Sequence, residues 1–213
     1  EHYGDPASWL EGDQWDSIMN YDAFMEPVTW FLTGMEKHSD SYNGGIWGDG
    51  EAFFNAMGYH MSRMQTNTVM TAMNQLSNHD HSRFLTRTNH KVGRVANLGY
   101  EAASQDINVA VMREAVVMQM TWPGAPTIYY GDEAGVCGWT DPDSRRTYPW
   151  GKEDLELIEF HRYMTGIHRK IPAIRKGAVK PLLAGYQKIA YGRMYGKYQA
   201  VVVISNSPDS QTM

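Results

Sequence analysis

A dense run of polar side chains follows one short apolar stretch of this chain. Residues 77–83 read Ser-Asn-His-Asp-His-Ser-Arg and come at the end of the predicted strand Met73–Ser77. Carboxylate and imidazole groups are the ones that proteins most often use to move protons and to stabilise charge. Parallel α/β sheets and barrels hold such groups at the carboxyl ends of their strands. The alternative is a solvated turn in which the aspartate only caps the next helix.

Helical and strand patterns alternate around this run. Apolar residues recur at steps of three and four in Gln105–Trp122, and the β-branched and aromatic run Ala125–Tyr130 follows after Pro-Gly as a predicted buried strand. Ala52–Gln65 reads as a helix before Met73–Ser77, and Asp154–Lys170 reads as a helix near the end. Helices that alternate with short strands predict a parallel α/β sheet or barrel.

The pattern changes after about residue 180. Lys188–Tyr195 and Tyr198–Ile204 both read as strands, and the two residues between them, Gly-Lys, suit a type II′ hairpin. We therefore expect antiparallel strands that pack as a separate small domain. Its predicted core includes Tyr191, Val201 and Val203.

The composition excludes several classes of partner. The 213 residues carry a net charge of -5 and no Lys/Arg run longer than two, which argues against nucleic acid and anionic membranes. The longest apolar runs fall far short of the roughly 20 residues of a membrane helix. The single cysteine, Cys137, excludes an internal disulfide but suits either redox compartment, so localisation stays open. Because the chain starts with Glu1, we expect its true beginning to be missing.

Four short motifs occur in one order along the chain. They are Asn78-His79-Asp80 with Arg83-Phe84, Pro123-Gly-Ala-Pro126, Ile128-Tyr-Tyr-Gly-Asp-Glu133 and Asp141-Pro-Asp-Ser-Arg-Arg146. Together they resemble the α-amylase family of glycoside hydrolases, and most of all its neopullulanase, cyclomaltodextrinase and maltogenic amylase type. The resemblance covers residues 1 to about 180.

The family fold is an eight-stranded (β/α)8 TIM barrel with its site at the carboxyl ends of the strands. The resemblance therefore implies that residues 1–180 are the C-terminal half of such a barrel, strands five to eight. It implies that residues 181–213 are the first strands of an antiparallel β-sandwich domain. The barrel strands would end at Glu1 (five) and span Asp16–Tyr21 (six), Met73–Ser77 (seven) and Thr127–Tyr130 (eight).

Two carboxylates match catalytic positions of the family. Glu1 matches the general acid/base, which protonates the departing glycosidic oxygen. Asp80 matches the acidic residue that stays ionised beside the sugar ring and stabilises the transition state. His79 would hydrogen-bond the same sugar, and the resemblance adds Asn78 and Arg83 as substrate-binding residues.

Further sugar contacts are expected in loops. Asp141 and Arg145 match positions that bind a sugar unit further from the scissile bond, with an ordinary surface ion pair as the alternative. Trp47 and Trp139 are candidates to stack on glucose rings. Trp47 belongs to the aperiodic stretch Gly34–Gly50, which is typical of a functional loop over a barrel mouth.

The resemblance implies a retaining hydrolase of α-glucosidic bonds in starch-derived oligosaccharides, cyclodextrins or pullulan, with an α-glucan oligosaccharide as its partner. A transglycosylase, a sucrose- or trehalose-handling member and a non-catalytic carbohydrate-binding relative remain alternatives. The nucleophilic aspartate of the family is expected before residue 1, so the fragment alone would be inactive. The sequence shows no complete metal site, and calcium and the oligomeric state stay open for the complete enzyme.

Overall fold

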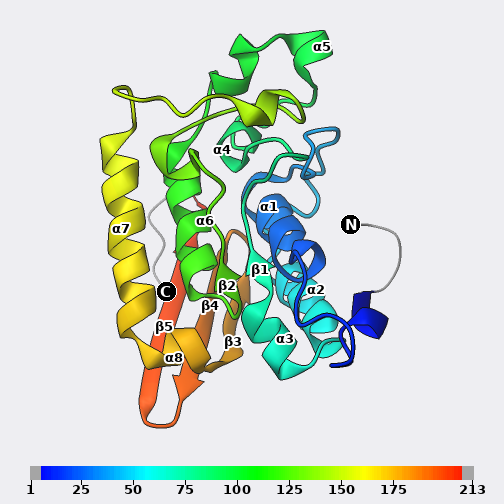
Figure 1. Ribbon diagram of the computed structural model, residues 1–213, viewed down its shortest axis with the longest axis vertical. Coiled ribbons are helices and arrows are strands. Elements are labelled where there is room, and N and C mark those ends of the chain that lie inside the picture. Colours follow the sequence, from blue (N-terminus) through cyan, green and yellow to red (C-terminus); the bar gives the residue numbers. More distant parts are fainter. Residues whose placement is uncertain (1–5, 208–213) are drawn as a thin grey trace.

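Two short strands far apart in the sequence run parallel in the middle of the molecule (Figure 1). The computed structural model describes residues 6–207. Strand β1 (Met73–Asn74) pairs in parallel with β2 (Ala125–Pro126), and Met19 forms a parallel bridge to Met73. The predicted parallel arrangement is therefore confirmed, although the regular strands are shorter than expected.

Helices connect and cover these parallel segments. Among residues 6–207, α1 to α3 lie between Met19 and β1, α4 to α6 between β1 and β2, and α7 and α8 follow β2. The α-helices are α1 (Glu26–Thr33), α2 (Gly50–Ser62), α3 (Thr66–Thr71), α4 (Phe84–Arg87), α5 (Val95–Leu98), α6 (Val109–Thr121), α7 (Leu155–Lys170) and α8 (Pro172–Lys176). The short turns of other helix types are η1 (Pro6–Trp9), η2 (Tyr21–Met25), η3 (Glu101–Ser104), η4 (Asp132–Ala134) and η5 (Asp143–Arg145). None of the described helices is long and apolar enough to cross a bilayer.

The two strongest helical patterns form helices, as predicted. Asn108 caps α6 by accepting hydrogen bonds from the backbone amides of Ala110 and Val111, and Asp154 caps α7 in the same way. The apolar stripe of α6 faces the core, and the helix ends at Trp122, directly before Pro-Gly. Figure 1 shows α7 standing beside α6.

The C-terminal segment forms an antiparallel sheet in the order β3-β4-β5. The strands are β3 (Ala178–Gly185), β4 (Lys188–Tyr195) and β5 (Tyr198–Ser205). Gly196 has a φ of 56°, a value that the first central residue of a type II′ turn needs and that glycine adopts without strain. The predicted hairpin is confirmed.

One prediction about this sheet is wrong. Tyr191 is fully buried, but Val201 and Val203 are 65% and 46% exposed, and Val202 and Ile204 are buried instead. Tyr191 pairs with Val202 across the strands, so the two side chains share one face. Since side chains alternate along a strand, the register sends both neighbours of Val202 to the other face.

The buried face of the sheet shares its hydrophobic cluster with the helices. The Trp122 ring lies 5.0 Å from the Tyr191 ring and 5.7 Å from Phe53 of α2, measured between centroids. The hydroxyls of Thr121 and Tyr191 are hydrogen-bonded to each other at 2.6 Å. Within the described residues, the sheet and the helices therefore share one hydrophobic core. The expected domain boundary near residue 180 stays a prediction.

The predicted buried strand Ala125–Tyr130 is regular only at its first two residues. The Thr127 amide still donates to the Asn74 carbonyl, at 2.9 Å, but Ile128 and Tyr130 are about 40% exposed. The Tyr130 hydroxyl donates to the Arg146 carbonyl instead of entering the core. The chain therefore leaves the sheet after Thr127 and enters the loop that carries η4 and η5.

The sheet register makes a testable prediction about stability. Replacing Val202 by Ala should lower the free energy of unfolding of the full protein by about 2 kcal/mol, since two buried methyl groups are lost. Val201→Ala is the matched control and should have almost no effect, because that side chain is exposed. Urea unfolding followed by circular dichroism measures both. Equal losses in the two variants would contradict this register.

Candidate active site

Asn78 shapes the loop that follows β1. Its side-chain oxygen accepts the backbone amides of Asp80 and His81, at 2.9 and 3.1 Å, and its amide donates to the Tyr21 hydroxyl at 2.8 Å. Asn78 is buried, whereas the side chains of His79 and Asp80 are 47% and 37% exposed. His79 Nε2 lies 3.3 Å from Asp80 Oδ1. The loop thus presents an imidazole and a carboxylate side by side.

Asp80 does not cap the next helix. The N-cap of α4 is Arg83, and the amide of the first helical residue, Phe84, donates to Ser77 Oγ at 2.9 Å rather than to Asp80. The alternative reading of residues 77–83, a turn in which the aspartate serves as a cap, is therefore wrong.

Arg83 ties this loop to the loop after β2. Its Nε donates to the Ser144 carbonyl at 2.9 Å, and its Nη1 donates to the Tyr130 carbonyl at 2.6 Å and to Asp132 Oδ1 at 3.1 Å. The guanidinium also lies 4.1 Å from the ring centroid of Tyr129. Burial raises the pKa of Asp132, and the charge of Arg83 opposes that rise.

The predicted sugar contact by Arg83 is wrong. The side chain is fully buried, and its Nε and Nη1 donate to acceptors inside the protein, so it does not reach a sugar at the surface. Asn78 is likewise turned to the protein, where its oxygen and amide bind backbone and Tyr21. Both residues hold the loop that exposes His79 and Asp80.

Asp141 and Arg145 form an exposed ion pair on the loop after β2. Arg145 Nε donates to Asp141 Oδ1 at 2.7 Å, and about half of each side chain is exposed. The hydrogen bond from Arg145 to Asp141 raises the pKa of Arg145. The pair flanks Ser144, whose hydroxyl donates to the His79 carbonyl at 2.7 Å, so it lies on the loop that contacts the Asp80 loop. Its geometry suits a surface ion pair and a sugar contact alike.

The two candidate tryptophans differ. Trp139 is fully buried, with Nε1 donating to the Gly99 carbonyl at 3.0 Å, so a stacking role on a sugar is wrong. Its loop folds inward because the Trp139 amide donates to Asp143 Oδ2 at 2.8 Å. Trp47 is half-buried, bonds to the Leu32 carbonyl at the end of α1 and packs against His90 at 5.0 Å. It belongs to a different cluster from the Asp80 loop.

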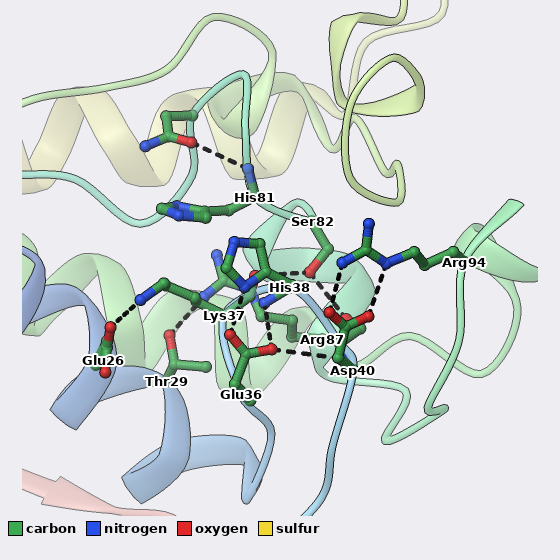
Figure 2. A network of polar contacts seen from close by, with 12 residues as sticks. Glu26, Thr29, Glu36, Lys37, His38, Asp40, His81, Ser82, Arg87 and Arg94 are labelled. Atoms are coloured by element: carbon green, nitrogen blue, oxygen red, sulfur yellow. Dashed lines mark hydrogen bonds and ion pairs between the residues drawn. The ribbon is translucent and has the colours of Figure 1, made fainter. Parts of the chain in front are cut away.

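The loop from Gly34 to Asp49 lies against the residues that follow β1, as Figure 2 shows for its polar contacts. Ser39 Oγ lies 2.8 Å from Ser82 Oγ, and the His38 and His81 rings meet edge to face at 4.7 Å. Burial, with a smaller effect from Arg87, lowers the pKa of His81 to about 2, so this histidine stays neutral. The loop thus supports the site, and its function stays a prediction.

Glu36, His38 and Asp40 bring potential metal ligands within 4.8 Å of one another. His38 Nδ1 already bonds Glu36 at 2.6 Å, and Arg94 binds both oxygens of Asp40 (Figure 2). Burial favours the neutral Glu36, but the hydrogen bonds of His38 outweigh it and hold the pKa of Glu36 at about 2. The two carboxylates of this cluster are therefore already engaged by His38 and Arg94.

Sequence reasoning missed three residues that hold the site, namely Tyr21, Asp132 and Ser144. The expectation that Tyr21 ends a strand, Asp16–Tyr21, is wrong, because only Met19 forms a β-bridge there and Tyr21 begins η2. Asp132 and Ser144 stand inside quoted motifs, but their contacts with Arg83 depend on tertiary structure. Glu1, the predicted general acid/base, lies outside the described residues.

Comparisons with known proteins agree on one family. The model of the alpha-amylase catalytic domain matches residues 1–175. Neopullulanase 2 of Thermoactinomyces vulgaris is 33% identical over 217 residues, covering 100% of this chain and 32% of the relative. An amylopullulanase of Thermoanaerobacter thermohydrosulfuricus is 33% identical over 202 residues, 91% of this chain and 13% of the relative. This chain thus spans about a third or less of these relatives' length.

Solved structures give the same answer. The debranching enzyme of Nostoc punctiforme superposes with a TM-score of 0.79 at 27% identity, over 99% of this chain and 41% of that one. The cyclic α-maltosyl-(1→6)-maltose hydrolase of Arthrobacter globiformis superposes with a TM-score of 0.75 at 25% identity, over 95% and 40%. That hydrolase has been solved with cyclic α-maltosyl-(1→6)-maltose and with maltose.

The contacts of Arg83 predict a large effect at Asp132. Asp132→Asn should lower the free energy of unfolding of the full protein by about 3 kcal/mol, because the buried guanidinium loses its carboxylate. The same change at Asp141 is the matched control and should leave stability nearly unchanged, since exposed ion pairs add little. Chemical unfolding of both variants gives the comparison. Equal stabilities would show that Arg83 does not depend on Asp132.

Proposed function

Because the chain belongs to the α-amylase family of glycoside hydrolases, we propose that it is part of a retaining enzyme that cleaves α-glucosidic bonds. The substrates are starch-derived oligosaccharides, cyclodextrins or pullulan. The names of the relatives support this choice, since they include neopullulanase, cyclomaltodextrinase and amylopullulanase. In this reading residues 1–180 are strands five to eight of the (β/α)8 barrel, and residues 181–213 begin a β-sandwich.

The position of the Asp80 carboxylate is the observation on which the proposal rests. The carboxylate is partly exposed after β1 and lies beside His79, whose carbonyl binds Ser144 of the loop that carries Asp141 and Arg145. An ionised carboxylate there can stabilise the positive charge that develops on a sugar ring when the glycosidic bond breaks. His79 offers a hydrogen bond to a hydroxyl of the same ring.

Other residues complete the proposed mechanism. Glu1 acts as general acid and base, giving its proton to the departing oxygen and then taking one from water. Asp141 and Arg145 bind a sugar unit further from the scissile bond through their exposed polar atoms. None of these residues is the nucleophilic aspartate of the family, so we propose that residues 1–213 alone are inactive.

The proposal predicts the behaviour of Asp80→Asn in the complete enzyme. The kcat on maltooligosaccharides should fall by about 10³-fold or more, since the change removes charge but preserves shape. Circular dichroism should show unchanged folding. Product analysis with cyclodextrin, pullulan and a sugar acceptor would separate hydrolysis from transglycosylation.

Asp106→Asn is the matched control for that experiment. Asp106 is exposed, and its φ of 57° is a left-handed value that asparagine also tolerates. Its kcat should stay within about twofold of the wild type. An Asp80→Asn enzyme that kept wild-type kcat would remove the catalytic role of Asp80.

A further inference from the structure

The peptide between His79 and Asp80 is held at both ends. Its N–H, on Asp80, donates to Asn78 Oδ1 at 2.9 Å. Its carbonyl, on His79, accepts a hydrogen bond from Ser144 Oγ at 2.7 Å. Because a peptide unit is planar, bonds at both ends fix its orientation. The amide of His81 donates to the same Asn78 oxygen at 3.1 Å and restrains the backbone on the other side of Asp80.

Ser144 is itself held from two sides. Its carbonyl accepts the Nε of Arg83 at 2.9 Å, and its hydroxyl is fully buried. Ser144 belongs to the turn η5, whose first residue, Asp143, accepts the amide of Trp139 and a salt bridge from Arg146. The donor to the His79 carbonyl is therefore a rigid part of the loop after β2 rather than a mobile surface hydroxyl.

We propose that Ser144 is a positioning residue for Asp80. Its hydroxyl proton stays on Ser144 and acts through the His79 carbonyl, so the residue touches no sugar itself. The inference rests on the proposed function, in which the Asp80 carboxylate must face the reacting sugar ring. A displacement of about 1 Å at a reacting centre can cost 10²-fold in rate, so freeing one end of this peptide affects the chemical step.

A purely structural role of Ser144 makes a different prediction. A buried hydroxyl that only holds a loop would lower the melting temperature but leave the folded enzyme with normal kcat. A positioning role lowers kcat while substrate binding, and hence KM, stays nearly the same. The division of the effect between kcat and KM therefore separates the two roles.

The test is Ser144→Ala in the complete enzyme, with maltooligosaccharides as substrate. We expect kcat to fall about tenfold, with KM within about twofold of wild type. Thr88→Val is the matched control, because Thr88 is a buried hydroxyl of the connection between β1 and α6 that accepts the Asn108 amide at 2.7 Å. It should lower the melting temperature to a similar extent and keep kcat within about twofold.

The outcomes separate this inference from the function on which it rests. Wild-type kcat in Ser144→Ala, alongside an inactive Asp80→Asn, would overturn the positioning role alone. A tenfold fall in both Ser144→Ala and Thr88→Val would also overturn it, since general loosening would then explain the loss. Wild-type kcat in Asp80→Asn would remove the proposed role of Asp80, and the role of Ser144 would fall with it.

Discussion

A buried positive charge holds this part of the molecule together. The guanidinium of Arg83 has no access to solvent, so the protein must balance its charge and accept the hydrogen bonds of its Nε and Nη1. It finds one carboxylate, Asp132, and the carbonyls of Tyr130 and Ser144. All three belong to the chain that follows β2, while Arg83 belongs to the chain that follows β1. The satisfaction of one charge therefore places two loops against each other.

The run of residues 77–83 contains both buried and exposed side chains. Ser77, Asn78, His81, Ser82 and Arg83 are buried and bind other parts of the protein, whereas His79 and Asp80 reach solvent. Contacts with other segments hold the buried side chains in place, since Asn78 donates to the Tyr21 hydroxyl and Ser82 Oγ lies next to Ser39 Oγ. A rigid inner row can hold an outer carboxylate within the small tolerance that catalysis requires.

The sequence predicted what depends on local pattern and missed what depends on tertiary contact. Helices α6 and α7 and the hairpin at Gly196 follow from periodicity, caps and turn chemistry. The face assigned to Val201 was wrong because the parity of a strand depends on its register with β4. Ser144 could not be predicted, because its hydroxyl and its carbonyl serve residues more than 60 positions away.

Two of the three acceptors of Arg83 are main-chain carbonyls, and this has an evolutionary consequence. Every amino acid carries a backbone carbonyl, so residue 130 can change its side chain without losing the hydrogen bond that its carbonyl accepts from Arg83. Only the arginine and its carboxylate partner, Asp132, must be inherited as a pair. Selection can then alter the exposed side chains of these loops while the buried contacts beneath them stay the same. Hydrogen bonds to backbone carbonyls therefore leave the sequence of the loop after β2 freer to change than hydrogen bonds to side chains would.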